Sequence, residues 1–381
     1  MTRVAATPDA VFRARKDQEL ANLRSLLSGL NIAPEEATQE IKDRFEQQIA
    51  NCVRQIDREA MDTTTLREIL DSKIRPVVTE VQDYLYAVLY RQAGLDNGVG
   101  AVAHWMLNDI ARRAGVERRV LLSIGEAELI EHTFSMIRMR HQDASVWRLP
   151  ILVHELGHHV ARNLRDVNPN AFAMLPVKTY LEDARDAREH RHLHELFADV
   201  FATYVLGAAY PTCVIIQQAR PDQGFHDHDQ THPSWPARVH IMLGALRAMS
   251  AIDPKDVTAG AFAQMADLNV EPLWSALTAE SAGSADPPTQ PELRALPERA
   301  AELVDLLVRH APARLRFRFG RAYDLSRDLT SRDDPALPEG ATITQVLDAA
   351  WRWRANNLSA NDNDLTIVSR NALRWCEAST H

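Results

Sequence analysis

Apolar side chains recur every three to four residues along most of the chain, which is the spacing that one face of an α-helix produces. Residues 1–95 contain two such stripes, over 41–56 and 66–88, and Pro76 interrupts the second. We interpret the two stripes as a helical hairpin that packs on the following domain. A coiled coil that binds a partner protein is the alternative.

Two short stretches, residues 119–124 and 133–140, are the best candidates for β-strands. Helical spacing returns in the segments that follow, at 146–163, 191–206 and 235–250. The low glycine content, 14 of 381 residues, also favours helices. The pattern therefore predicts a mainly α protein with a small β-sheet, of the α+β class.

Turn and linker residues divide the chain into three predicted parts. A glycine-containing turn at 94–100 ends an N-terminal helical region, residues 1–95. The next part, residues 96–250, holds the strand candidates and the helices with the most informative polar residues. Residues 251–381 form a C-terminal helical region, which contains a proline-rich linker at 281–291.

The composition is that of an ordinary globular protein, with 45% hydrophobic and 25% charged residues. The net charge of −9 argues against a nucleic-acid partner, because nucleic-acid-binding proteins present a basic surface. No apolar stretch reaches the roughly 18 residues of a membrane span, and no secretory signal is visible. The three cysteines are far apart, which fits the reducing cytoplasm, where we place the protein.

The segment His154-Glu155-Leu156-Gly157-His158 gives the strongest indication of chemistry. Residues four positions apart project from the same side of a helix, so the two imidazoles can bind one metal ion. Glu155 then faces the open coordination position, where it can act as a general base. The alternative is a pair of histidines that are solvated, or packed in the core without a metal.

A later helix carries two acidic residues with the same spacing. Glu195 and Asp199 lie beside an apolar stripe that includes Leu196, Val200 and Tyr204. A carboxylate next to a buried face is costly unless a metal ion or a hydrogen-bond partner compensates it. Both acids are therefore candidates for a metal centre.

These two helices resemble those of the gluzincin metallopeptidases, in which H-E-x-x-H is completed by a second helix with the pattern E-x-x-x-D. The resemblance implies a zincin-like catalytic core with a single Zn²⁺ ion per chain, bound by His154, His158 and Glu195. It also implies that Asp199 accepts the distal N–H of a ligand histidine and so fixes the tautomer of that ring.

A third segment, which begins at Thr231 and ends at Arg238, is similar to the T-H-P-x-x-x-x-R motif of peptidase family M48 (the CAAX prenyl protease and HtpX-like enzymes). The similarity covers about residues 140–250 and indicates a soluble form of this core. It implies that His232 faces the zinc and that Arg238 pairs with the carboxylates of the site, so both join Glu155 as candidate catalytic residues. His232 is either a hydrogen-bond donor to the oxyanion or a resting-state zinc ligand, and the sequence leaves both open.

Together the motifs predict a zinc-dependent metalloendopeptidase that hydrolyses peptide bonds of a protein or peptide substrate. Glu155 is the general base for a zinc-activated water that attacks the scissile carbonyl. The alternative is a zinc-stabilised helical binding or regulatory protein that keeps the fold without turnover. A purely structural metal site needs no general base, so Glu155 favours the enzyme.

Overall fold

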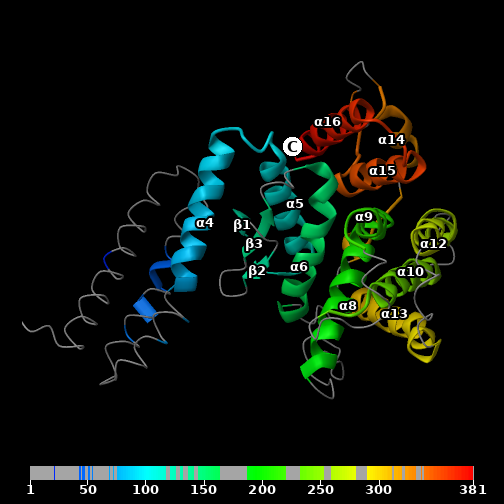
Figure 1. Cartoon of the computed structure of the whole chain (residues 1–381), viewed down its shortest axis with the longest axis horizontal. Helices are drawn as coiled ribbons and strands as arrows, with labels where there is room; N and C mark the ends of the chain where they lie inside the picture. Colours follow the sequence, from blue (N-terminus) through cyan, green and yellow to red (C-terminus); the bar gives the residue numbers. More distant parts are fainter. Residues whose placement is uncertain are drawn as a thin grey trace, which may run out of the picture. The chain divides into compact units, whose positions relative to one another are not determined.

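The computed structural model (Figure 1) describes scattered positions between 21 and 72 and then residues 75–116, 121–125, 129–131, 136–140, 145–163, 187–219, 232–252, 259–279, 290–310, 313–319, 322–331, 336 and 339–380. These residues are mostly helical, which confirms the predominantly helical class. The chain divides into a smaller compact unit, Met1–Leu95 with Leu122–Glu126, and a larger unit that contains the rest. None of the described helices combines the length and the apolar character needed to cross a lipid bilayer.

In the smaller unit the described structure centres on helix α4 (Arg75–Gln92). Pro76 lies in the first turn of this helix, where a missing N–H costs no helical hydrogen bond. The rings of Tyr84 and Phe45 pack at a centroid separation of 6.4 Å, and both side chains are buried. Arg91 donates a hydrogen bond to the carbonyl oxygen of Leu122 in strand β1 (Leu121–Gly125). Most of the predicted hairpin before α4 lies outside the described residues.

A tight turn follows α4 and leads into helix α5 (Val99–Arg113). Gly94, Asn97 and Gly98 adopt positive φ angles of 68°, 51° and 87°, which glycine and asparagine tolerate best. The buried carboxylate of Asp96 accepts hydrogen bonds from the backbone N–H groups of Gly98 and Gly100, at 3.1 and 2.8 Å. It thereby satisfies donors that have no partner within the helix.

Two short strands belong to the larger unit. β2 (Leu129–Glu131) pairs antiparallel with β3 (Met136–Arg140), with Ile130 opposite Ile137. Ile137 and Met139 lie on one face of β3 and are buried. β3 covers the last residues of the stretch predicted as a strand at 133–140, whereas β2 occupies a stretch in which no strand was predicted.

Two closely packed helices form the centre of the larger unit. A single 3-10 turn, η4 (Val146–Arg148), leads into α6 (Leu149–Asn163), which also contacts β2 and β3. Helix α8 (Ala187–Leu206) packs along α6 and carries the second set of polar residues. Both helices extend over the segments that the hydrophobic spacing predicted.

Helices α9 (Ala209–Gln217) and α10 (Trp235–Ala251) complete the surroundings of α8. A turn at Gly207, with φ 61°, separates α8 from α9 and lies against the ring of Phe317. Ser234 caps α10, because its hydroxyl oxygen accepts a hydrogen bond from the backbone N–H of Ala237 at 3.4 Å. Pro236 lies in the first turn of the same helix.

The remaining elements are α11 (Ala259–Met265), the π-helical turn η6 (Ala266–Val270), α12 (Glu271–Ala279), α13 (Gln290–His310), η8 (Ala313–Leu315), α14 (Ala322–Asp328), α15 (Ile343–Asn356) and α16 (Asp362–Ala378). Figure 1 shows α14, α15 and α16 grouped together, in orange and red. The indole rings of Trp351 in α15 and Trp147 in η4 meet edge to face at 5.3 Å. These helices therefore pack on the central helices within one unit.

Candidate metal centre

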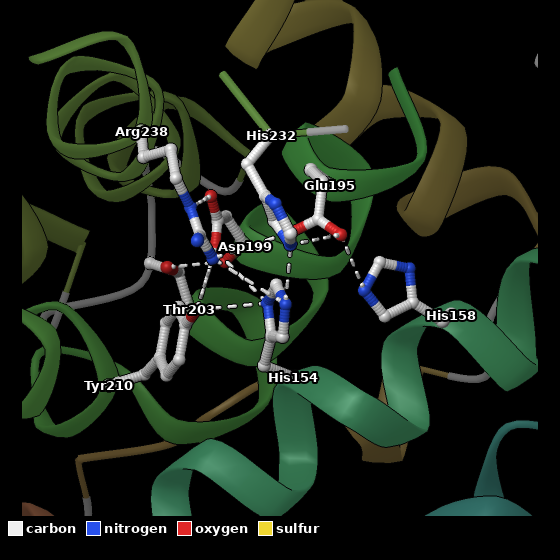
Figure 2. Close-up of polar contacts among 8 residues, drawn as sticks. All are labelled: His154, His158, Glu195, Asp199, Thr203, Tyr210, His232 and Arg238. Atoms are coloured by element: carbon white, nitrogen blue, oxygen red, sulfur yellow. Dashed lines mark hydrogen bonds and ion pairs between the residues drawn. The ribbon is translucent and has the colours of Figure 1, made fainter. Parts of the chain in front are cut away.

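Helix α6 presents His154 and His158 on one side, one turn apart. Their rings meet edge to face with centroids 4.8 Å apart (Figure 2). His154 is buried and His158 is partly exposed. The opposite side of the helix, which includes Leu152 and Leu156, is buried in the core, so packing holds the two imidazoles on the side toward α8.

Glu195 reaches the two histidines from α8. Its Oε2 atom lies 3.4 Å from Nε2 of His154, and its Oε1 atom lies 3.2 Å from Nε2 of His158. The ligand atoms of the three side chains all lie within 4.8 Å of one another, so the group could hold a metal ion. In the part of the chain that the structure describes, no second group of histidines, cysteines and acids has this arrangement.

Gly157 allows α6 and α8 to approach closely enough for this convergence. A methyl group on Gly157 would lie 2.9 Å from the backbone Cα of Ala198 and 3.2 Å from the ring of Phe201. Separations below 3 Å are not tolerated between carbon atoms, and a backbone atom cannot turn aside. Glycine at this position therefore sets the distance between the helix with the histidines and the helix with Glu195.

Asp199 lies one turn beyond Glu195 on α8 and is fully buried. Its Oδ1 atom lies 3.0 Å from Nδ1 of His154, on the far side of that ring from Glu195. One turn further on, Thr203 donates a hydrogen bond of 2.7 Å to the backbone carbonyl of Asp199. The structure thus places Asp199 where it can orient His154.

Arg238 of α10 compensates the buried charge of Asp199. Its Nε and Nη2 atoms donate hydrogen bonds of 2.8 and 2.7 Å to the two carboxylate oxygens, which is a bidentate ion pair. Nη2 also lies 3.7 Å from Oε2 of Glu195, and the guanidinium stacks over the ring of Trp235. Arg238 therefore contacts both carboxylates of the centre, from behind Asp199 (Figure 2).

Tyr210, at the start of α9, belongs to the centre although the sequence analysis did not identify it. Its hydroxyl donates a hydrogen bond of 2.5 Å to Oδ1 of Asp199 and lies 2.9 Å from Nδ1 of His154. The side chain is fully buried, and burial raises the pKa of the hydroxyl well above its usual value. No spacing rule connects Tyr210 to the motifs, because it follows a turn and lies on a different helix.

His232 precedes α10 and is the most exposed member of the centre, with 51% of its side chain accessible. Its Nε2 atom lies 3.7 Å from Oε1 of Glu195, so Glu195 stands between His232 and His158 (Figure 2). Glu155, which follows His154 directly in α6, is partly exposed. Both side chains are thus accessible to a molecule that approaches from solvent.

The carboxylates dominate the electrostatics of the centre. Burial alone would lower the pKa of His154, but hydrogen bonds with Asp199 and Glu195 outweigh it and raise the pKa to about 10. Burial opposes ionisation of Glu195, yet its hydrogen bonds with His154 and His158 hold the pKa of this carboxyl well below the usual range. The ion pair with Arg238 likewise outweighs burial and lowers the pKa of Asp199 to about 2. The centre therefore favours positive charge where the imidazoles and Glu195 meet.

The structure brings together six of the predicted site residues, which are His154, His158, Glu195, Asp199, His232 and Arg238. For Glu155 it shows the position directly after His154 in α6 and a partly exposed side chain. The structure also adds Tyr210 from α9 to the group. The arrangement is suited to binding a cation between His154, His158 and Glu195. Behind these residues, Asp199 contacts His154, and Arg238 compensates the charge of Asp199.

No protein-family model matches the chain, and no curated protein or solved structure matches it either.

Proposed function

We propose that the chain is a zinc-dependent metalloendopeptidase of the gluzincin type, with a zincin-like core, that acts on a protein or peptide substrate. The observation that carries the proposal is the convergence of His154, His158 and Glu195 from two helices, with Glu155 directly after the first ligand. Three protein ligands leave a coordination position open, which is typical of catalytic rather than structural zinc sites.

Zinc suits this set of donors. It binds imidazole nitrogen and carboxylate oxygen at about 2.0–2.2 Å in tetrahedral geometry, so that neighbouring ligand atoms lie about 3.4 Å apart. Oε2 of Glu195 lies 3.4 Å from Nε2 of His154, and Oε1 lies 3.2 Å from Nε2 of His158. One ligand atom from each of the three residues lies within 4.8 Å of the others, which is close enough for all three to bind one ion. When bound, zinc supplies Lewis-acid activation of a water molecule and of the scissile carbonyl.

The residues of the chain supply the proton transfers and the hydrogen bonds of the reaction. The carboxylate of Glu155 accepts a proton from the attacking water and then donates it to the leaving amine nitrogen. His232, on the exposed side of Glu195, donates a hydrogen bond to the carbonyl oxygen as negative charge develops there. Arg238 acts from behind, because its ion pair keeps Asp199 ionised and oriented toward His154.

The test compares the wild-type protein with Glu155→Gln for zinc content and for hydrolysis of casein. We expect both proteins to bind zinc equally and the wild type to cleave casein until a chelator removes the metal. Glu155→Gln should be slower by about 10²–10⁴-fold, because an amide cannot accept the proton. Glu302→Gln makes the same change at an exposed carboxylate of α13 and should cleave at the wild-type rate.

Three results would contradict the proposal in different ways. Zinc binding without cleavage by the wild type would favour the zinc-stabilised binding protein. Cleavage by Glu155→Gln at nearly the wild-type rate would show that another residue is the base. A wild-type protein without affinity for zinc would overturn the metal centre itself.

A further inference from the structure

The buried hydroxyl of Tyr210 contacts two residues of the centre on the side away from the metal position. We propose that Tyr210 is a positioning residue, which fixes the tautomer and the ring orientation of His154 so that Nε2 stays directed at the metal. This inference rests on the proposed zinc site but not on peptidase activity. It gives a role to a residue that none of the motifs contains.

The hydrogen-bonding capacity of the surrounding groups determines where the hydrogen of His154 lies. Arg238 donates to both oxygens of Asp199, at 2.8 and 2.7 Å, so this carboxylate is ionised and only accepts. The single hydrogen of the Tyr210 hydroxyl is used in its 2.5 Å bond to Asp199. Nδ1 of His154 faces the hydroxyl oxygen of Tyr210 at 2.9 Å and Oδ1 of Asp199 at 3.0 Å. Neither oxygen has a hydrogen left to donate to Nδ1, so Nδ1 must itself carry a hydrogen. Nε2 is then the nitrogen that binds the metal.

The ring of Tyr210 also limits the movement of His154. The two rings lie nearly parallel, with an interplanar angle of 11° and centroids 5.7 Å apart. Both side chains are buried, and a close-packed interior leaves no room for the imidazole to turn about its Cβ–Cγ bond. Tyr210 thus holds the orientation of His154 by packing and its tautomer by hydrogen bonding.

Tyr210→Phe separates these two contributions, because it keeps the ring and removes only the hydroxyl. Without the hydroxyl, Nδ1–H of His154 keeps Asp199 as its one acceptor, and the imidazole is held less firmly. Loss of an interaction that orients a metal ligand typically lowers metal affinity by about 10–100-fold. We expect a loss of this size in the zinc affinity of Tyr210→Phe, measured by competition with a chromophoric chelator.

Tyr204→Phe is the matched control. Tyr204 is also buried in the larger unit, on α8, and charge from Arg316 rather than from the metal centre acts on its hydroxyl. The control should bind zinc with wild-type affinity. Unchanged zinc affinity in Tyr210→Phe would overturn the proposal, and so would an equal loss in Tyr204→Phe, which would point to a general effect of removing a buried hydroxyl.

A measurement on the wild type decides the matter even if Tyr210→Phe does not fold. Nitrogen-15 NMR of the histidine side chains in the zinc-loaded protein identifies which nitrogen of His154 carries hydrogen. We expect a hydrogen on Nδ1 that exchanges slowly with water, and faster exchange in Tyr210→Phe. A hydrogen-free Nδ1 would overturn the assignment. Neither the zinc affinity nor the NMR measurement requires catalysis. Both therefore test the role of Tyr210 even if the protein is not a peptidase.

Discussion

Asp199 shows at the residue scale how the centre keeps a buried charge. Its carboxylate is fully buried, yet three side chains supply hydrogen bonds to it, from Arg238, Tyr210 and His154. A buried ion pair of this kind stabilises little by itself, but the loss of one partner leaves an uncompensated charge. The arrangement is therefore better suited to orienting His154 than to stabilising the fold.

The pKa of His154 gives a prediction for the metal-free protein. The folded-state pKa is about 10, above the ordinary value of 6.5, because hydrogen bonds with Asp199 and Glu195 outweigh burial. The stabilisation by protonated His154 is therefore complete below pH 6.5 and is lost as the pH rises through about 10. Urea unfolding with a chelator present should show a falling free energy of unfolding across this window.

The variant His154→Gln provides the comparison for this pH dependence. It cannot take up the proton, so its free energy of unfolding should change less between these two pH values. A wild type whose stability is constant across the window would contradict the pKa shift. The same experiment with zinc bound should show no such loss, because the metal binds the neutral imidazole.

At the scale of elements, the close packing of α6 and α8 sets the geometry of the centre. The histidines come from one helix and Glu195 from the other, so the distances between their ligand atoms depend on how closely the two helices pack. This close packing depends on the absence of a side chain at Gly157, which faces the backbone of Ala198. Gly157 is not itself a metal ligand, yet it thus controls the distances between the ligands.

We predict that Gly157→Ala lowers zinc affinity by at least about tenfold. Alanine favours a helix over glycine by about 1 kcal/mol, but the new methyl group must push α6 away from α8. The zinc affinity, measured by chelator competition, should decline, and so should the midpoint temperature of thermal unfolding. The matched control is Gly260→Ala in α11, where a methyl group would meet nothing within 4 Å. Wild-type zinc affinity in Gly157→Ala would show that the two helices adjust without moving the ligands.

Local rules were enough to predict the helices that carry the ligands. The spacing of His154 and His158, and of Glu195 and Asp199, has meaning within a single helix, so a sequence pattern can reveal it. Helix α9 was not predicted, because its residues are apolar on all sides and show no amphipathic spacing. Strand β2 has three residues and exists through its pairing with β3, which no local pattern indicates.

The parts of the site that the sequence did not predict also depend on contacts between elements. Tyr210 reaches Asp199 only through the turn at Gly207, which brings α9 back against α8. The contact between Gly157 and Ala198 depends on the crossing of two helices. Both contacts join segments from different helices, so the local patterns of a single sequence do not predict them.

At the scale of the whole molecule, the metal ligands and their partners all belong to the larger compact unit. We predict that zinc stabilises this unit selectively. At a free concentration of about 100 times Kd, bound zinc adds about 2.7 kcal/mol to the free energy of unfolding. Hydrogen exchange should slow in α6, α8 and α10 when zinc is added, and exchange in α4 of the smaller unit should stay unchanged. Equal slowing in α4 would show that the two units unfold together.

The bidentate pair of Arg238 with Asp199 has a consequence for the newly made chain. Arg238 lies 39 positions after Asp199, so the carboxylate of Asp199 lacks this partner until Arg238 has been synthesised. At a synthesis rate of about 5–20 residues per second, this interval lasts roughly 2–8 s. During that time His154, His158 and Glu195 have already been synthesised, but the complete centre has not formed. A centre built in this way is therefore incomplete until translation has passed Arg238.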